Sequence, residues 1–332
     1  MRPLRFGLSL KLPLPVVLAV VLAGCGGPPP APVTFRVCYY ATQDFLPYFV
    51  MQEQGFAAQN GLRFEERSFP GGAAAIDAMV AGSLDLCTGV GTVPLLAAAD
   101  RGLIPGAIVA VAGNNFADRD HRGGAVVAAP SIRDWRDLAG KRIAVNARSA
   151  SISTAAVVGR LKLEGVTGYS LVEIPFANMG LAVAGGNVAA ASMSEPFLTQ
   201  SLLRGDGKLL DWVVGGAPFE RAEFTAIVVS ADLLRRSPQG AKAYLRAHLQ
   251  AVGWINTNLG KARVLLARRL DLTREIGEKL NLLRWPGDAR NDPGLLEAMQ
   301  PLLIEIGALK ARIPARRLYD ETLLDQVLAE KR

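Results

Sequence analysis

The chain has 332 residues, of which 50% are hydrophobic, so it is long enough to form two lobes with substantial cores. Its 37 Lys and Arg residues against 30 Asp and Glu residues give a formal net charge of +7, and basic residues gather only in short pairs such as Arg235 and Arg236. This mild, dispersed charge argues against a nucleic-acid partner.

The N-terminal residues have the composition of a leader segment. Arg2, Arg5 and Lys11 are followed by an apolar stretch that is too short and too rich in proline to become a mature transmembrane helix. The stretch ends in Leu-Ala-Gly-Cys at 22–25, which matches the lipobox of bacterial lipoproteins. We therefore expect a signal peptide over 1–24 and a lipid on the Cys25 thiol, which would anchor an exported protein to a membrane. The alternative is an ordinary secretory signal with a chance cysteine.

A Pro- and Gly-rich tether is predicted at 25–33. Loss of the leader would leave 34 basic residues against the same 30 acidic ones, a net charge of +4. The expected location is the periplasmic side of a bacterial membrane, or the outer cell surface in a Gram-positive host.

Strands and helices alternate along the first half of the mature chain. The hydrophobic pattern predicts strands at 35–40, 62–67, 84–87 and 108–112, and helices at 47–59, 73–81 and 94–101. Pro47 begins the first of these helices, a position where proline is tolerated. Repeated βα units with short loops predict a parallel, doubly wound sheet.

A similar series of elements starts again near residue 125. The pattern predicts strands at 125–129, 141–145, 171–174 and 188–193, and helices at 131–138, 151–163 and 179–184. Two matching series predict two lobes of similar topology. A further strand at 224–229 is followed by apolar residues at helical spacing, which predicts C-terminal helices packed on the first lobe.

Cys38 and Cys87 both fall in predicted strands. The sequence favours two buried free thiols, because neighbouring parallel strands rarely give the geometry that a disulfide needs. A disulfide is the alternative in an oxidising compartment.

Several motifs, taken in order, resemble one family of exported proteins. They are Tyr-Phe-Val-Met-Gln-Glu-Gln-Gly-Phe at 48–56, Asn-Gly-Leu at 60–62, Ala-Met-Val-Ala-Gly-Ser-Leu-Asp at 78–85, Asp-Leu-Ala-Gly-Lys-Arg-Ile-Ala-Val at 137–145 and Glu-Pro at 195–196. Their order and spacing resemble the solute-binding components of ABC importers, in the branch for nitrate, sulfonate or taurine, and thiamine-pyrimidine precursors. The chain departs from that family at 188–190, where many members have Val-Asp-Ala and this chain has Val-Ala-Ala.

The resemblance implies a type II periplasmic binding fold, in which two doubly wound, mostly parallel α/β lobes clamp a ligand between them. We place the hinge crossings near 123–127 and 222–225, so that lobe 1 is 34–122 plus 225–332 and lobe 2 is 123–224. The implied function is capture of a small organic solute by hinge closure. The solute would pass to a membrane permease with its ATPase. The protein would act as a monomer without a cofactor, and the alternative is a ligand-binding lipoprotein that acts as a sensor or scaffold.

Candidate ligand contacts lie in loops at the carboxyl ends of the predicted strands, where open α/β sheets bind ligands. Arg148 would clamp an anion, or is a solvated loop residue. Glu195 would bind an amine or ring N–H, or join a hinge salt bridge, and Asp44 is a polar contact or a helix cap. The other candidates are Gln43, Gly71, Gly89, Val90, Asn115, Ser149 and Asn178.

Aromatic residues gather near the same loops, and they would either stack on a flat ring or belong to the core. They are Tyr39, Tyr40, Phe45, Tyr48 and Phe116. Together with Arg148 they favour an alkanesulfonate, or an aromatic or heteroaromatic compound such as a pyrimidine, over nitrate.

Signatures of catalysis are missing from the sequence. Its two histidines, His121 and His248, have no Cys or His partner at metal-ligand spacing. The sequence contains neither a Gly-x-Ser-x-Gly elbow nor a phosphate-binding Gly-x-x-x-x-Gly-Lys loop. We therefore expect a binding protein without a metal, and not an enzyme.

Overall fold

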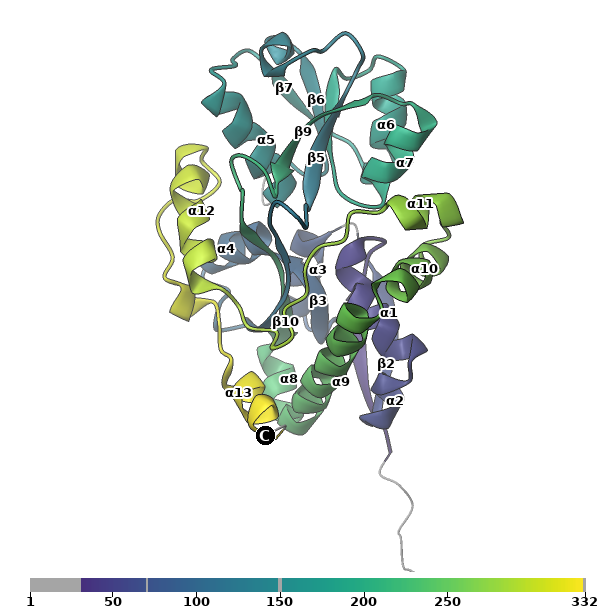
Figure 1. Cartoon of the computed structure of the whole chain (residues 1–332). Coiled ribbons are helices and arrows are strands. Elements are labelled where there is room, and N and C mark those ends of the chain that lie inside the picture. Colours follow the sequence, from purple (N-terminus) through teal and green to yellow (C-terminus); the bar gives the residue numbers. More distant parts are fainter. Residues whose placement is uncertain (1–30, 70, 149–150, 331–332) are drawn as a thin grey trace, which may run out of the picture. The chain divides into compact units, whose positions relative to one another are not determined.

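The computed structural model describes residues 31–69, 71–148 and 151–330 (Figure 1). The predicted leader, Cys25 and Ser149 lie outside the described residues. Residues 32–332 form one compact unit. None of the helices in the described ranges combines the length and the apolar character needed to cross a membrane.

The first sheet has five strands in the order β2-β1-β3-β10-β4. These strands are β1 (Val33–Tyr39), β2 (Leu62–Ser68), β3 (Leu86–Gly91), β4 (Ile108–Ala117) and β10 (Ala222–Ser230). β1 pairs in parallel with β2 and β3, whereas β10 lies antiparallel between β3 and β4. Every residue of β4 and β10 is buried, as expected for strands covered on both faces.

The second sheet repeats this arrangement in the order β7-β6-β8-β5-β9. Its strands are β5 (Gly124–Ala128), β6 (Arg142–Val145), β7 (Ser170–Glu173), β8 (Ala190–Met193) and β9 (Lys208–Val214). β6 is parallel to β7 and β8, and β5 is antiparallel to β8 and β9. The predicted fold class, two lobes that each hold a doubly wound and mostly parallel sheet, is confirmed.

The chain passes from the first sheet to the second between β4 and β5, and returns between β9 and β10. The two crossing segments contact each other, since the main-chain N–H of Gly123 donates to the carbonyl of Val214 at 2.9 Å.

The helices of the first part of the chain follow the predicted alternation. They are α1 (Leu46–Glu53), α2 (Phe56–Gln59), α3 (Gly72–Val80), α4 (Thr92–Asp100), α5 (Ile152–Leu163), α6 (Phe176–Ala184) and α7 (Phe197–Arg204), with 3-10 turns η1 (Gln43–Phe45) and η2 (Trp135–Leu138). The helix predicted over 47–59 is in fact two helices, because Gly55 adopts φ 73°, a left-handed conformation that ends a helix.

The helices after β10 pack mainly on the first sheet and its helices. They are α8 (Ala231–Arg236), α9 (Pro238–Thr257), α10 (Leu259–Arg269), α11 (Arg274–Lys279), α12 (Pro293–Glu305) and α13 (Thr322–Ala329), with the 3-10 turn η3 (Ala315–Arg317). α9 buries Tyr244, Leu245, Val252 and Ile255, and it packs on α1, α2 and α13. This stripe has the spacing of an amphipathic helix.

Several predicted boundaries are wrong. Residues 88–91 and 114–116, expected to be loops, continue β3 and β4, and β9 was not predicted at all.

The expectation of two free thiols is also wrong, because Cys38 and Cys87 form a disulfide with a Cα–Cα distance of 5.0 Å. β1 and β3 are neighbours with Val37 opposite Leu86, so the next residue on each strand is a cysteine. This register brings the two side chains together.

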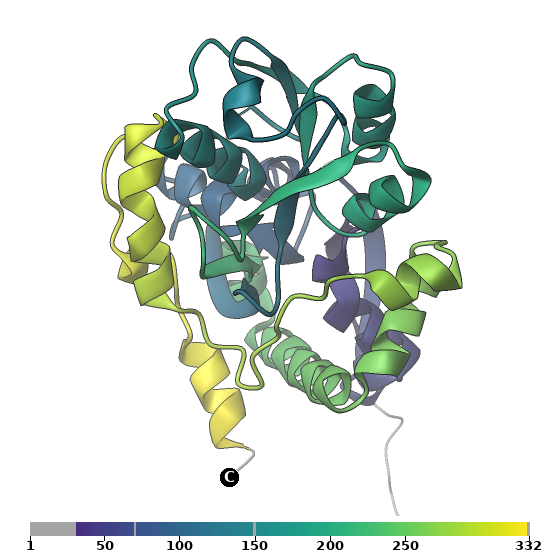
Figure 2. The same ribbon diagram turned by 45° about the horizontal axis from the view of Figure 1, so that its top comes forward.

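The C-terminal segment covers the free edge of β4. The main-chain N–H of Gly113 donates to Ala289 at 2.8 Å, Phe116 and Arg284 exchange two main-chain hydrogen bonds, and Ala110 pairs with Tyr319 in a parallel bridge. α13 then contacts β4 and α9 (Figure 2). These contacts satisfy the hydrogen-bonding groups that an edge strand would otherwise expose.

Candidate functional site

A buried hydrogen-bonded cluster lies where β1 ends in η1. The Asp44 carboxylate accepts from Asn115 Nδ2 at 3.0 Å and from Thr42 Oγ1 at 2.7 Å. Asn114 Nδ2 donates to the main-chain oxygen of Asp44 at 3.0 Å. On β10, Thr225 donates to Asn115 Oδ1 at 2.8 Å and accepts from Asn114 Nδ2 at 2.9 Å. The cluster thus ties η1 to β4 and β10 through buried side chains, which fixes their positions.

The charge of Asp44 has no cationic partner in the described part of the chain. Its side chain is 5% exposed, and both of its hydrogen-bond donors are neutral. Burial raises the pKa of Asp44, while the hydrogen bonds from Thr42 and Asn115 act in the opposite direction.

Tyr40 and Gly89 lie against this carboxylate. A Cβ added at Gly89 would lie 3.1 Å from Asp44 Cβ and 3.4 Å from Tyr40 Oη, so only glycine lets β3 come this close. Burial, together with the nearby Asp44 charge, holds the pKa of Tyr40 well above its usual value. The Tyr40 ring meets Phe45 edge to face, with ring centroids 4.5 Å apart, and remains partly exposed.

Glu195 follows β8 in the second lobe and is 1% exposed. Its carboxylate accepts from Thr199 N at 3.1 Å, Thr199 Oγ1 at 2.9 Å, Asn281 N at 3.1 Å and Asn281 Nδ2 at 3.2 Å. Burial raises the pKa of Glu195, and these four donors oppose that shift. Neither a hinge salt bridge nor an open acceptor is seen here, since neutral groups from Thr199 and Asn281 hold both oxygens.

One irregular stretch between α11 and α12, residues 280–285, meets groups of both lobes; we call it the connecting segment. Asn281 binds Glu195 of the second sheet's lobe, and the Leu283 N–H donates to Gln43 Oε1 at 2.9 Å in the first. Gln43 Nε2 is buried and has no hydrogen-bond partner in the described structure. The connecting segment therefore brings the neighbourhoods of Asp44 and Glu195 together.

Sequence reasoning missed Asn281 and Leu283. The connecting segment has no regular periodicity, and its one signal is an asparagine within the apolar run 280–283. A polar side chain between leucines is often held by a specific partner.

The other predicted contacts from the first lobe are mostly core residues. Phe45 and Tyr48 are fully buried, and the Tyr48 hydroxyl donates to Glu66 Oε1 at 3.0 Å. Val90 is buried in β3, Tyr39 is partly buried against Phe45, and Gly71 precedes α3.

In the second lobe, Arg148 and Asn178 are exposed. The Arg148 main-chain N–H donates to Glu173 at 3.3 Å, but its guanidinium makes no hydrogen bond or salt bridge with the residues that the structure describes. The structure does not bring these two residues to the Asp44 cluster: Arg148 precedes α5, whose N-cap is Ser151, and Asn178 lies in the first turn of α6.

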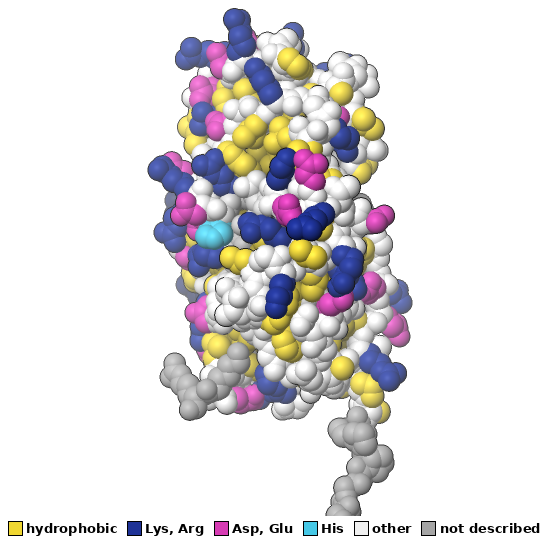
Figure 3. Space-filling view, turned by 45° about the vertical axis from the view of Figure 1, so that its right-hand side comes forward, with side chains coloured by type: hydrophobic (Ala, Val, Ile, Leu, Met, Phe, Trp, Pro, Cys, Tyr) yellow, Lys and Arg dark blue, Asp and Glu magenta, His cyan; other side chains and the backbone are white. Residues whose placement is uncertain are grey.

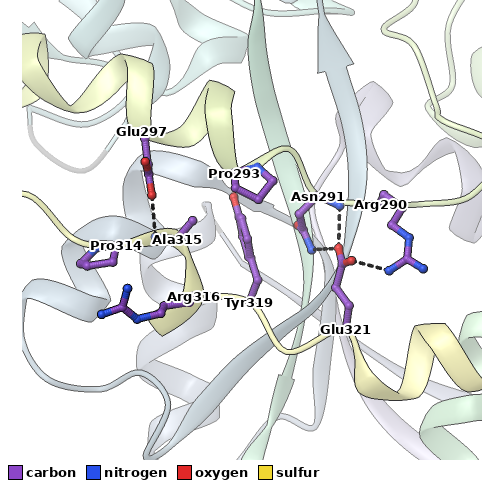
Figure 4. A pocket seen from close by; sticks show the side chains of 9 residues that line it. All are labelled: Arg290, Asn291, Pro293, Glu297, Pro314, Ala315, Arg316, Tyr319 and Glu321. Atoms are coloured by element: carbon purple, nitrogen blue, oxygen red, sulfur yellow. Dashed lines mark hydrogen bonds and ion pairs between the residues drawn. The ribbon is translucent and has the colours of Figure 1, made fainter.

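A cavity of about 610 Å³ lies elsewhere, in the C-terminal part of the chain (Figure 4). Its wall includes Arg290, which pairs with Glu321 at 2.7 Å, and Tyr319, whose hydroxyl donates to the buried Glu223 at 2.9 Å. No predicted site residue lines this cavity. Within the described ranges, no group of three or more His, Cys, Asp or Glu side chains is arranged to hold a metal ion.

Comparisons with solved structures show which known proteins share this fold. The alkanesulfonate-binding protein SsuA from Xanthomonas axonopodis pv. citri, bound to MOPS, is 19% identical with a TM-score of 0.69, over 87% of this chain and 98% of that one. The periplasmic nitrate-binding protein NrtA from Synechocystis PCC 6803 is 16% identical with a TM-score of 0.74, over 90% and 89%. The desulfurization enzyme DszB has 16% identity and a TM-score of 0.64, over 90% and 99%. The chain therefore shares its two-lobe fold with periplasmic binding proteins and with at least one enzyme.

Comparison of the sequence with family models identifies the family directly. No curated protein matches the chain. The model of the NMT1-like family matches residues 27–268. Because this match spans well over half of the sequence, and the predicted resemblance to the nitrate, sulfonate and pyrimidine-precursor branch is thereby confirmed, the chain belongs to the NMT1-like family.

Proposed function

We propose that the protein is the solute-binding component of an ABC importer, which captures a small organic solute between its lobes and delivers it to a membrane permease. Family membership and the two-lobe fold support this function. The observation that carries it is a set of buried polar groups: Gln43 from one lobe and Glu195 from the other both bind the connecting segment, and Asp44 is the neighbour of Gln43 in η1.

Hinge closure is the expected response to the solute. Among the described residues, the chain crosses between the sheets in two segments, one after β4 and one after β9, and β10 follows the second of them directly. Rotation about two neighbouring segments changes the distance between the lobes without repacking either sheet. The Asp44 cluster is fixed to β4 and β10, so that first lobe would present a preformed half of the site.

Export and anchoring belong to the same proposal. The lipobox cysteine, Cys25, would carry the lipid, and the tether at 25–33 would reach about 30 Å when extended. Exposed apolar side chains on α6 and α7 would suit contact with a protein partner such as the permease. Leu181 is 61% exposed and Leu203 is 39% exposed, and Figure 3 shows hydrophobic side chains gathered over the upper, second lobe.

Binding without turnover distinguishes this function from that of an enzyme on the same fold. The described residues of the Asp44 cluster are Thr, Asn, Asp and Tyr side chains, without a histidine or thiol to activate a nucleophile. We therefore infer that the site holds its solute unchanged.

The test uses the fragment 32–332, which is one compact unit. A panel of sulfonates, nitrate, aromatic carboxylates, pyrimidines and organic amines would be screened by thermal shift and then by small-angle scattering. A true ligand at 100 times its Kd should add about 2.7 kcal/mol to the free energy of unfolding, and should reduce the radius of gyration as the lobes close. Recovery of a chemically altered compound would instead favour an enzyme, and absence of any binding would overturn the proposal.

A further inference from the structure

Asp44 and Glu195 are the two carboxylates of the candidate site, and they share an unusual environment. They are 5% and 1% exposed, and every hydrogen bond that they accept in the described structure comes from a neutral hydroxyl, amide or main-chain N–H. Taking a carboxylate out of water is costly unless a positive charge compensates it. The protein supplies no such charge to either group.

The two other buried aspartates of the described chain do have cationic partners. Asp85 accepts from Arg36 Nη2 at 2.6 Å and also pairs with Arg236. Asp206 accepts from Arg204 Nη2 at 2.6 Å. Asp44 differs from both of these aspartates, because only neutral groups donate to it.

Cations near the site are already engaged or point elsewhere. The Arg284 guanidinium stacks over the Phe116 ring at 5.5 Å and pairs with Asp118 at 3.5 Å. Arg148 is exposed and has no described contact with the cluster. None of the described hydrogen bonds or salt bridges therefore joins an arginine to Asp44 or Glu195.

We propose that the solute is a small organic cation, whose protonated amine or amidine binds the Asp44 carboxylate and whose hydrogen-bond acceptor binds Gln43 Nε2. This inference rests on the proposed function and names the class of its substrate.

Three features support the cationic group. A carboxylate has about four lone-pair positions, and Asp44 uses two of them for Thr42 and Asn115, so it can still accept a charge-assisted bond. The partly exposed Tyr40 ring stands next to that carboxylate, and an aromatic face attracts a cation. A bound cation would also oppose the effect of burial, which raises the pKa of Asp44.

Gln43 supplies the independent second contact. Its side chain is 2% exposed, its Oε1 accepts from Leu283 N at 2.9 Å, and its Nε2 has no partner in the described structure. A buried amide donor without an acceptor costs free energy. Since Gln43 and Asp44 are consecutive in η1, a donor and an acceptor stand side by side, and a solute with the opposite pair would satisfy both.

The test compares 3-substituted pyridines of similar size that carry different charges. The probes are 3-(aminomethyl)pyridine as the cation, which keeps its ring nitrogen as an acceptor, nicotinamide as the neutral compound and pyridine-3-sulfonate as the anion. A wider set of amines, amidines, sulfonates and carboxylates, together with any compound that copurifies with the fragment 32–332, would be measured by calorimetry. We expect binding to be confined to cations. Binding of an anion would overturn the inference and leave the proposed function standing, whereas no binding in any class would overturn both.

Variants then locate the contact. Asp44→Asn keeps the shape of the side chain and should weaken binding of the cation about 10- to 100-fold, the usual effect of losing a charge-assisted hydrogen bond. Glu65→Gln, an exposed carboxylate on β2, is the matched control and should bind as the parent does. Unchanged affinity in Asp44→Asn, or loss of binding in Arg148→Ala, would contradict the assignment. Thermal unfolding of each variant would verify that it folds.

Discussion

The two ends of the first sheet each hold a buried aspartate, and the two aspartates have partners of different charge. Asp85 lies at the amino end of β3, is 2% exposed, and is bound by the guanidinium groups of Arg36 and Arg236. These partners hold its pKa below the usual value even though burial acts to raise it. Asp44 lies beyond the carboxyl end of β1, has only neutral donors, and has a raised pKa. One carboxylate has arginine partners within the fold, and the other has only neutral donors.

The largest expected effect comes from removing each charge in turn. Asp85→Asn should lower the free energy of unfolding by about 3–4 kcal/mol, because two arginines lose their buried partner. Asp44→Asn should change it by less than about 1 kcal/mol, because no cation loses a partner and the amide can still accept a hydrogen bond. Urea unfolding of the fragment 32–332 measures both. Equal losses of unfolding free energy in the two variants would contradict the distinction between Asp85 and Asp44.

Glu223 sharpens the comparison, since it is a third buried carboxylate without a cation. It accepts from Asp292 N at 3.0 Å and Tyr319 Oη at 2.9 Å, and burial raises its pKa to about 8. The folded state therefore keeps a proton that the unfolded state loses above pH 4.5. The contribution of Glu223 to the free energy of unfolding is fully present below that pH and is lost as the pH rises to 8.

The expected loss of unfolding free energy over this window is several kcal/mol, since each unit of pKa difference corresponds to about 1.4 kcal/mol. Glu223→Gln keeps an acceptor but cannot ionise, so its stability should vary less between pH 4.5 and pH 8 than that of the parent. Parallel curves of unfolding free energy against pH for the two proteins would contradict this assignment. Glu220→Gln, an exposed neighbour in the crossing segment, is the control.

His248 is a buried basic group, and its replacement should change the free energy of unfolding least at neutral pH. It is fully buried in α9, neither ring nitrogen has a partner in the described structure, and burial lowers its pKa to about 3. Below pH 6.5 the unfolded state binds a proton that the folded state does not bind. The free energy of unfolding therefore falls as the pH drops from 6.5 towards 3.

His248→Leu should raise the unfolding free energy by about 1–2 kcal/mol at neutral pH, because it removes buried groups without partners. It should also reduce the loss of stability in acid. His121→Gln, in a crossing loop, tests whether any histidine replacement has this effect. Destabilisation by His248→Leu at every pH would show that the imidazole has a partner in solution.

Local sequence patterns were sufficient to predict most of the fold. Alternating apolar residues predicted β2, and Asn60, Gly61 and Gly82 placed the ends of the first helices, because these signals depend on neighbours in the chain. The position of β10 between β3 and β4 depends on pairing with residues more than a hundred positions away, which periodicity does not encode. The disulfide was missed for the same reason: the register of β1 against β3 decides it.

The residues of the candidate site also fall into two groups, those predicted from the order of elements and those placed by tertiary packing. Asp44, Asn115 and Glu195 were predicted because they lie near the carboxyl ends of strands, a rule that needs only the order of elements. Asn281 belongs to an irregular segment, and only tertiary packing brings it to Glu195. The exposure of Arg148 depends on how a loop folds back, so its charge alone suggested an anion site that the described structure does not assemble.

The placement of β10 has a consequence for the order of folding. The fourth strand along the first sheet is made of residues 222–230, which follow the whole second lobe in the chain, and the outer edge of β4 is covered by residues still later. During synthesis the first sheet therefore stays unfinished, with one edge of β3 and both edges of β4 uncovered, until the second lobe has emerged. The second sheet uses only residues between 124 and 214, so it can be completed before the first sheet, although it begins later in the chain.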